Sequence, residues 1–262
     1  MKSVVIAECL VALGLTAMPA QAQPQAGQSC QGVPAHPALR AALVAAQTQA
    51  NGGLGFHMWG SLVDRDGSVC AVAFTGGDRG DQWPGSRVIS AQKANTANAF
   101  SLPKFALSTA NLFSAVQPGQ SLFGLQESNP VDTGVAYGGN AALFGQPNDP
   151  MRGKRVGGVN VFGGGLALYT AEGRLVGALG VSGDTSCADH IIAWKVRHAL
   201  NLDNVPAGVA GAAKDNIIHD VAVDAATGHT VSKSGFGHAL CSSDSTSIAA
   251  ALATSHPTGP TP

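Results

Sequence analysis

The chain has 262 residues, of which 45% are hydrophobic and 12% are charged, and its formal net charge is −1. The hydrophobic fraction is sufficient for a packed core, whereas the near-neutral charge offers no basic face for nucleic acid and no polybasic patch for an anionic membrane. The low charge and the 34 glycines are typical either of a surface that contacts other subunits or of a biased coding composition.

The N-terminus has the layout of a secretory signal peptide. Lys2 precedes an apolar run from Val4 to Ala17, and Ala20-Gln21-Ala22 has the small-x-small pattern of a cleavage site. The apolar run is shorter than the roughly 20 residues that a membrane-spanning helix needs, although an uncleaved anchor is the alternative. We therefore predict a signal peptide over residues 1–22 and a mature chain that is exported, to the periplasm or outside the cell.

Cysteine usage agrees with export. Cys9 lies in the signal peptide, which leaves Cys30, Cys70, Cys187 and Cys241, an even number in an oxidising compartment. We predict two disulfides and no free thiol. Sequence alone allows three pairings, of which we prefer Cys30 with Cys241 and Cys70 with Cys187.

In the first half of the chain, apolar residues at helical spacing predict a helix over 38–50. Two β-rich runs form a predicted hairpin over 56–74, with the turn at Asp64-Arg-Asp-Gly67. A helix of small residues then begins near Ser86, the expected N-cap, and ends before Pro103.

The second half begins with a short predicted helix over 105–114. A long segment over 117–154, rich in Gly, Asn and Pro, has little periodicity, which is typical of functional loops or interface arms. A second hairpin follows over 159–181 with its turn at 170–173, and the last core helix spans 186–200.

The order of these elements predicts an α+β domain, with an antiparallel sheet formed by two hairpins and flanked by helices. We expect this domain over residues 23–205 and a C-terminal extension over 206–241. The Ser/Thr/Ala/Pro-rich composition of residues 242–262 predicts a disordered tail.

Several motifs, taken in order, resemble one family. They are the hairpin Trp59–Cys70, the Lys93-bearing helix Ser86–Phe100, the glycine-rich hairpin Gly163–Gly183, and Asp189-His190 at the opening of the following helix. This series is similar to the GlcG/HbpS-like haem-binding family from about Pro37 to Leu200. The resemblance implies a profilin-like sheet, assembly into a homo-oligomer, and haem or another tetrapyrrole as the ligand.

The candidate cofactor-binding residues lie on the lysine helix, on the second hairpin, or just after it. They are Arg87, Lys93, Gly163, Gly164, Gly165, Ser182, Gly183, Asp189 and His190. Lys93 could pair with a haem propionate or a substrate carboxylate, or instead extend to solvent or to a neighbouring subunit. The three glycines could accept a flat ligand or a neighbouring helix. Arg87 and Lys93 lie on opposing sides of a regular helix, so both face one cavity only if Arg87 belongs to an irregular first turn.

The turn after the second hairpin opens onto a helix N-terminus, which favours anionic groups, although a tight turn capped by Ser186 explains it equally. Asp189 matches the family's acidic position and could simply interact with the helix dipole. His190 stands where many members carry glutamate, and it is our candidate axial ligand for haem iron, with His57 as runner-up. Four further histidines, His198, His219, His229 and His238, are expected at the surface or in the extension.

Three functions remain open. The first is an exported, non-catalytic haem- or tetrapyrrole-binding protein that sequesters its ligand or assists in sensing. The second is an enzyme acting on a small carboxylate or carbonyl metabolite, and the third is a non-catalytic oligomeric accessory protein. A serine hydrolase is disfavoured because Asp184 replaces the second glycine of G-x-S-x-G around Ser182, and no H-E-x-x-H indicates a metal hydrolase.

Overall fold

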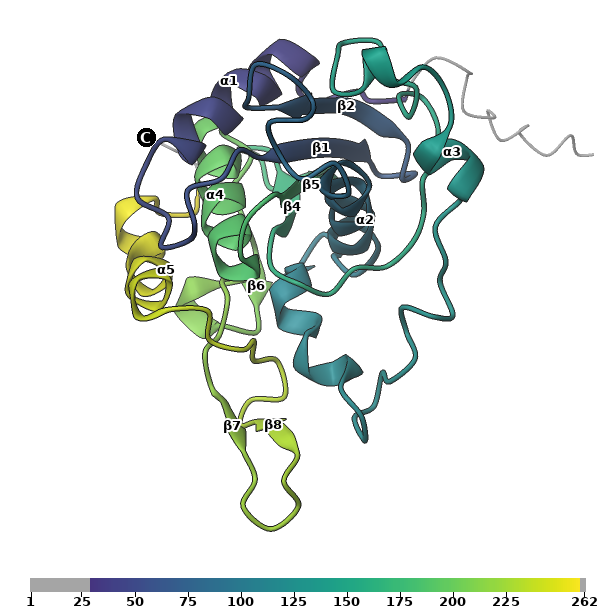
Figure 1. Cartoon of the computed structure of the whole chain (residues 1–262). Helices are drawn as coiled ribbons and strands as arrows, with labels where there is room; N and C mark the ends of the chain where they lie inside the picture. The colour runs from purple at the N-terminus through teal and green to yellow at the C-terminus, as the bar shows by residue number, and fades with distance from the viewer. Residues whose placement is uncertain (1–28, 260–262) are drawn as a thin grey trace, which may run out of the picture.

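A four-stranded antiparallel sheet lies at the centre of the computed structural model, which describes residues 29–259 (Figure 1). Its strands are β1 (Trp59–Asp64), β2 (Val69–Phe74), β4 (Gly165–Tyr169) and β5 (Leu175–Ser182), in the spatial order β2-β1-β5-β4. Strand β1 pairs with β2, strand β4 pairs with β5, and β1 joins the two hairpins by pairing with β5. The predicted α+β fold, with two hairpins in one antiparallel sheet, is confirmed.

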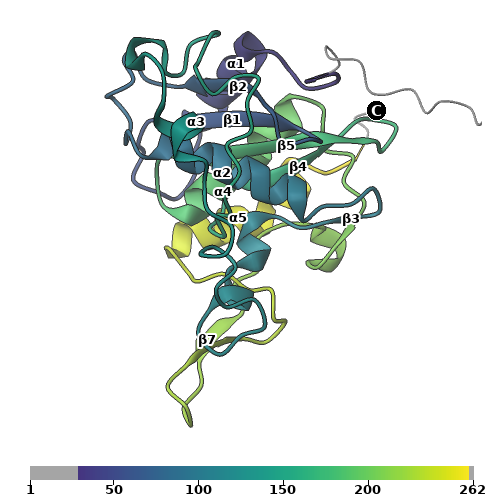
Figure 2. The same cartoon turned by 90° about the vertical axis from the view of Figure 1, so that its right-hand side faces the viewer.

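Helices cover both faces of this sheet. Helix α2 (Ser86–Ala99) packs on one face, and helices α1 (His36–Gln47) and α4 (Ser186–Ala199) pack on the other (Figures 1 and 2). Side chains of a strand alternate between faces, so Trp59 and Val63 belong to the α2 side whereas Leu62 belongs to the core under α1 and α4. The sheet is therefore buried on both sides, which explains its run of apolar and small residues.

Glycines in the sheet allow α2 to lie unusually close to it. A Cβ added to Gly180 would stand 1.9 Å from the carbonyl oxygen of Ser90, and one added to Gly165 would stand 2.5 Å from that of Lys93. Only residues without a side chain fit under the helix at these points. The glycines thus fix the position of α2, and with it the position of Arg87 and Lys93.

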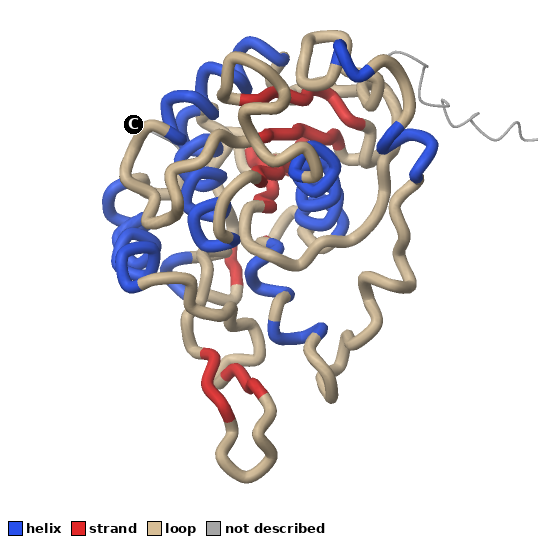
Figure 3. Tube along the Cα trace, in the orientation of Figure 1, coloured by secondary structure: helices blue, strands red, loops and turns tan. Residues whose placement is uncertain are grey.

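The remaining elements are short, with one exception. They are β3 (Phe105–Ala106), η1 (Thr109–Leu112), η2 (Ser114–Val116), α3 (Thr133–Tyr137), η3 (Ala141–Leu143), β6 (Ala207–Gly208), η4 (Gly211–Ala213), β7 (Val221–Val223), β8 (Thr230–Ser232) and the longer α5 (Ser243–Ser255). The predicted helix over 105–114 is wrong, because this segment holds a two-residue strand and a 3₁₀ turn instead. Figure 3 shows the long irregular path between α2 and β4, and the β7–β8 hairpin projecting from the body.

The prediction of a disordered tail over 242–262 is wrong for the part that forms α5. Ser242 is the N-cap of this helix and forms a capping box with Ser245, in which the Ser242 hydroxyl accepts the amide N–H of Ser245 at 3.0 Å. Ala249 and Leu252 are buried in the core beside α4. The composition that indicates disorder also supplies the small side chains that let α5 pack.

The chain contains two disulfides, as predicted, but the pairing that we preferred is wrong. Cys30 pairs with Cys70, and Cys187 pairs with Cys241. The first bond ties the N-terminal lead to β2, an edge strand, while the second ties the start of α4 to the segment before α5. The sheet order decides the pairing, because it places Cys70 and Cys187 in different parts of the domain.

Within residues 29–259, none of the helices combines the length and the apolar character that a membrane span requires. The predicted signal peptide, residues 1–22, lies outside the described residues.

Candidate functional site

The first turn of α2 separates two cavities. Arg87 lines the larger one, with a volume of about 440 Å³, and Lys93 lines the smaller one, with a volume of about 210 Å³. The helix is regular from Ser86 onward, so the prediction that the two cations lie on opposing sides is confirmed. One ligand therefore does not engage both.

The larger cavity lies between α2, β1 and the irregular segment that follows α3. Its walls are mostly apolar and aromatic, with Trp59, Val88 and Phe144 among the residues that line it. Tyr137 and Arg79 line it too, and both side chains are about half exposed or more. The cavity thus combines a mostly apolar interior with a phenol and a guanidinium that reach solvent.

Arg87 is bonded to groups of the protein itself and is not available to a ligand. Its guanidinium forms a bidentate ion pair with Asp149, at 2.5 and 2.9 Å, and donates to the carbonyl of Ala136. It also stacks on the ring of Phe144, 3.7 Å from the centroid. Arg87 therefore anchors the irregular segment against α2, and through that contact it builds the wall of the cavity.

The smaller cavity is closed at its base by a buried ion pair. The Nζ of Lys93 lies 2.7 Å from Oδ2 of Asp189 and donates to the carbonyl of Val181 at 3.1 Å. Burial raises the pKa of Asp189 to about 6, although Lys93 and the N–H of Asp184 both counteract that shift. The pair is therefore a potential proton-carrying group at the base of a small apolar pocket with walls from Trp83, Ile89 and Phe162.

The charges around the smaller cavity do not favour an anion. Asp184 also lines it, so two carboxylates face one ammonium. Asp184 accepts the amide N–H groups of Leu54 and Thr185, and the side chain of Thr185 caps α4. The amide N–H groups of Cys187, Ala188 and Asp189 in the first turn of α4 are already bonded within the protein, which gives no support to the expectation that this N-terminus attracts an anionic ligand.

The glycines predicted to cradle a ligand instead pack against the protein itself. A Cβ on Gly163 would meet the carbonyl of Ser186 at 2.2 Å, one on Gly164 the carbonyl of Val181, and one on Gly183 the carbonyl of His57. These close approaches account for glycine at positions 163–165 and 183. Ser182, in contrast, does line the smaller cavity.

His190 does not fit the predicted role of iron ligand. Its side chain is fully buried, and its Nε2 lies 3.1 Å from both Oδ1 of Asn216 and the amide nitrogen of Ile217. Burial lowers its pKa to about 3, so the ring is neutral. It is not among the residues that line either cavity. The C-terminal extension, which supplies Asn216, covers it.

His57, the runner-up, is exposed. Its Nδ1 lies 3.0 Å from the hydroxyl of Thr75, and the adjacent Phe56 stacks edge-on against Trp83, a residue of the smaller cavity. His57 therefore stands near the rim of that cavity.

Sequence reasoning missed the larger cavity because its outer wall comes from a segment without periodicity. Tyr137 and Phe144 supply that wall. The only available signal was the presence of aromatic residues in a loop otherwise rich in Gly and Asn. His238, which we expected at the surface or in the extension, lies in the extension, and sequence reasoning did not foresee that it is buried, with 2% of its surface exposed.

Comparison with known proteins gives one family match. The model of the family described as "Haem degrading protein HbpS-like" matches residues 35–197. The comparison with curated proteins found no match.

Several solved structures are similar to this chain at low identity. A PduOC–haem complex is 26% identical with a TM-score of 0.44, covering 63% of this chain and 91% of that one. Protein ORFY of Klebsiella pneumoniae is 25% identical with a TM-score of 0.45, covering 71% and 97%. HbpS is 18% identical with a TM-score of 0.42, covering 70% and 96%.

Proposed function

Because this chain belongs to the HbpS-like family, we propose that it binds haem or a related tetrapyrrole. The family match carries the proposal, and the larger cavity supports it. Binding sites for small molecules have volumes of about 300–1,000 Å³ with mostly apolar walls. The cavity of about 440 Å³ falls within that range, whereas the one of about 210 Å³ does not.

The residues of the larger cavity fit the parts of a haem. Trp59, Val88 and Phe144 offer an apolar surface to the macrocycle. The exposed Arg79, which forms an ion pair with Asp78 at 3.6 Å, is the cation that a propionate could reach in exchange for that contact. Haem iron is held by His, Cys, Met or Tyr side chains. Among the described residues that line this cavity, Tyr137 is the only one of these types, so it, rather than His190, is the residue that would hold the iron. A bound haem would supply redox-active iron.

A substitution at Gly85 tests the site. Gly85 lines the cavity in a right-handed helical conformation, and a Cβ added there meets no atom within 4 Å. Gly85→Trp should therefore fold normally while filling the cavity, and we expect haemin affinity to fall at least tenfold in a Soret titration. Gly85→Ala is the matched control and should bind as the wild type does. Undiminished binding by Gly85→Trp would exclude this cavity.

The axial ligand is tested separately. Tyr137→Phe should change the Soret and charge-transfer bands of the haemin complex, because the iron loses its phenolate. His57→Ala, which alters the exposed histidine near the other cavity, should leave the spectrum unchanged. The reverse result would move the ligand to the smaller cavity, and failure of the wild type to bind haemin would overturn the proposal itself.

Three further parts of this proposal concern the protein's setting. We propose that the chain is exported, which its two disulfides support, that it forms a homo-oligomer, and that it sequesters haem without turning it over. Mass spectrometry of the exported chain would locate the cleavage site, and light scattering would give the oligomer mass. Loss of the Soret band when a reductant and oxygen are added to the complex would contradict sequestration.

The smaller cavity favours a second candidate function, in which a small carbonyl compound is bound or converted. Lys93 can donate to a carbonyl oxygen, and Asp189 can carry a proton, while the two carboxylates disfavour a carboxylate substrate. Hydroxyacetone and pyruvate form a matched pair of probes, since they differ mainly in charge. We expect hydroxyacetone alone to raise the melting temperature, and to lose that effect in Asp189→Asn.

A further inference from the structure

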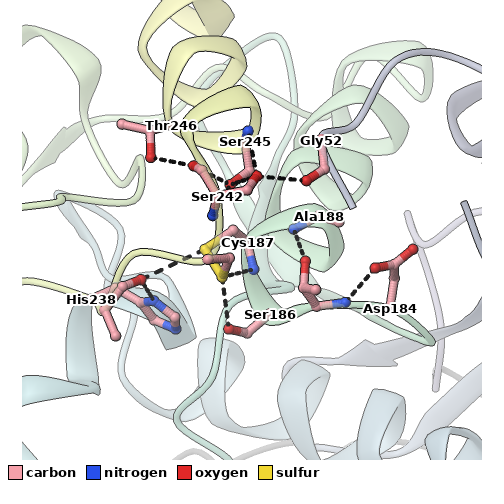
Figure 4. Close-up of a disulfide and its surroundings, with 12 residues drawn as sticks. Gly52, Asp184, Ser186, Cys187, Ala188, His238, Ser242, Ser245 and Thr246 are labelled. Carbon is pink, nitrogen blue, oxygen red and sulfur yellow. Dashed lines mark hydrogen bonds between the residues drawn. A yellow bond between two sulfur atoms is a disulfide. The ribbon is translucent and has the colours of Figure 1, made fainter. Parts of the chain in front are cut away.

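Two cysteines and a histidine meet where the C-terminal extension is fastened to α4. Cys187 and Cys241 form a disulfide, and a ring nitrogen of His238 lies within 4.8 Å of both sulfur atoms (Figure 4). Cys187 and His238 are buried, whereas Cys241 is exposed. The three residues come from two segments, the first turn of α4 and the stretch that leads into α5.

His238 has the features of a metal ligand that is not yet used. Its Nδ1 lies 2.7 Å from the carbonyl oxygen of Ala239 and can only donate to it, which fixes the neutral tautomer and leaves a lone pair on Nε2. That Nε2 is buried without a hydrogen-bond partner among the described residues. A buried lone pair without a donor is costly unless something binds it.

We propose that reduction of the Cys187–Cys241 disulfide converts this corner into a Zn²⁺ site, with two thiolates and the His238 imidazole as ligands. A dithiol supplies the two electrons and two protons that reduce the bond and is itself oxidised to a disulfide. Zn²⁺ then displaces one proton from each cysteine thiol. Three protein ligands of this kind leave the fourth tetrahedral position to water.

The local geometry accommodates both states. Zn–S bonds of about 2.3 Å place two sulfurs roughly 3.8 Å apart in a tetrahedral site. The Cα atoms of Cys187 and Cys241 are 6.0 Å apart, so separating the sulfurs needs side-chain rotation rather than movement of the backbone.

The first turn of α4 also favours reduction. Cys241 is the exposed residue of the disulfide, so a reductant attacks there and the leaving thiolate is that of Cys187. Cys187 is the second residue of α4, where the positive end of the helix dipole stabilises negative charge. The amide N–H of Cys187 already points at the sulfur of Cys241, at 3.3 Å, and would stabilise a thiolate there as well.

The other disulfide lacks the matching ligand. Asp64 lies near Cys30 and Cys70, but its oxygens already accept three amide N–H groups, from Cys30, Asp66 and Ser68. The proposed zinc site therefore belongs to one corner of the molecule. There, bound Zn²⁺ would replace the disulfide as the cross-link between α4 and the C-terminal extension. The extension that covers His190 would therefore stay in place when the disulfide is reduced.

The test compares the oxidised and the reduced full-length mature chain. With Zn²⁺ and a chromophoric chelator as competitor, we expect the reduced chain to bind one equivalent and the oxidised chain to bind none at the same concentration. Co²⁺ in place of Zn²⁺ should show a thiolate-to-metal charge-transfer band. Cys241→Ser should abolish that band, and His238→Ala should weaken binding at least tenfold. His198→Ala, at the other end of α4, is the control and should bind normally.

Thermal unfolding distinguishes a folded site from cysteines of an unfolded chain. Zn²⁺ should raise the melting temperature of the reduced wild type but not that of reduced His238→Ala. Equal binding by the oxidised chain, binding that survives Cys241→Ser, or zinc binding without a rise in melting temperature would each overturn the proposal.

Discussion

The Lys93–Asp189 pair gives the sharpest test of the physical account of the site. Lys93 and Asp189 are buried together, with side chains 2% and 3% exposed and 2.7 Å between Nζ and Oδ2. Lys93→Met keeps most of the side-chain volume but removes the charge. The carboxylate of Asp189 then remains in a low-dielectric environment with only the N–H of Asp184 as a partner. Breaking such a pair is destabilising because one charge stays buried and unpaired.

The cost should depend on pH in a predictable way. A carboxyl group avoids the penalty by binding a proton, so the penalty is limited to the free energy of protonating a group whose ordinary pKa is 3.8. At about 1.4 kcal/mol per pH unit, that limit is about 5 kcal/mol at pH 7.5 and about 2 kcal/mol at pH 5. The wild type, in which the pKa of Asp189 is about 6, already carries about 3 kcal/mol of that penalty at pH 7.5 and nearly all of it at pH 5. Lys93→Met should therefore cost up to about 2 kcal/mol at pH 7.5 and little at pH 5.

Urea unfolding at the two pH values measures this difference. The double variant Lys93→Met/Asp189→Asn is the control, because the amide keeps an acceptor for the N–H of Asp184 without carrying a charge. We expect it to regain most of the lost stability at pH 7.5. An equal cost of Lys93→Met at both pH values, or no recovery in the double variant, would show that the buried charge is not what makes Lys93 necessary.

Three further outcomes follow from the same contacts. In the wild type, the raised pKa of Asp189 stabilises the fold below pH 3.8, and this contribution is lost as the pH rises through about 6. Between these pH values, urea unfolding should show that the free energy of unfolding of the wild type falls by about 3 kcal/mol relative to that of Asp189→Asn. Replacing Cys30 and Cys70 by Ser should lower the free energy of unfolding by about 4 kcal/mol, the chain-entropy value for a loop of 40 residues. Gly180→Ala should cost about 3 kcal/mol or more in the same assay, because its Cβ would lie 1.9 Å from the carbonyl of Ser90 and force α2 away from the sheet.

The central fold could be predicted because its signals are local. The turn at Asp64–Gly67 and the turn after Tyr169 each join two β-rich runs, and both hairpins are present. The small-residue helix around Lys93 could likewise be assigned from its composition and from Pro103. The ion-pair partner of Lys93 could not be predicted, because Asp189 approaches Lys93 only when β5 lies beside β1.

The errors share a physical cause, which is contact between distant segments. The role of His190 depends on Asn216 and Ile217, which follow it by more than 25 residues and have no helical or strand periodicity. The disulfide partner of Cys187 depends on where the same extension returns to α4. Local patterns describe an element and its ends, but they do not say which other segment will cover it.

The close seat of α2 connects the fold to both candidate functions. Glycines at positions 165 and 180 allow the helix to pack closely against the sheet. The first turn of the helix then separates the two cavities. Because Gly85 and Lys93 belong to different cavities, substitutions at these positions perturb one cavity at a time. Loss of haemin binding in Gly85→Trp but not in Lys93→Met would assign the tetrapyrrole to the larger cavity and leave the ion pair free for other chemistry. Loss in Lys93→Met alone would place the ligand on the opposite side of the same helix.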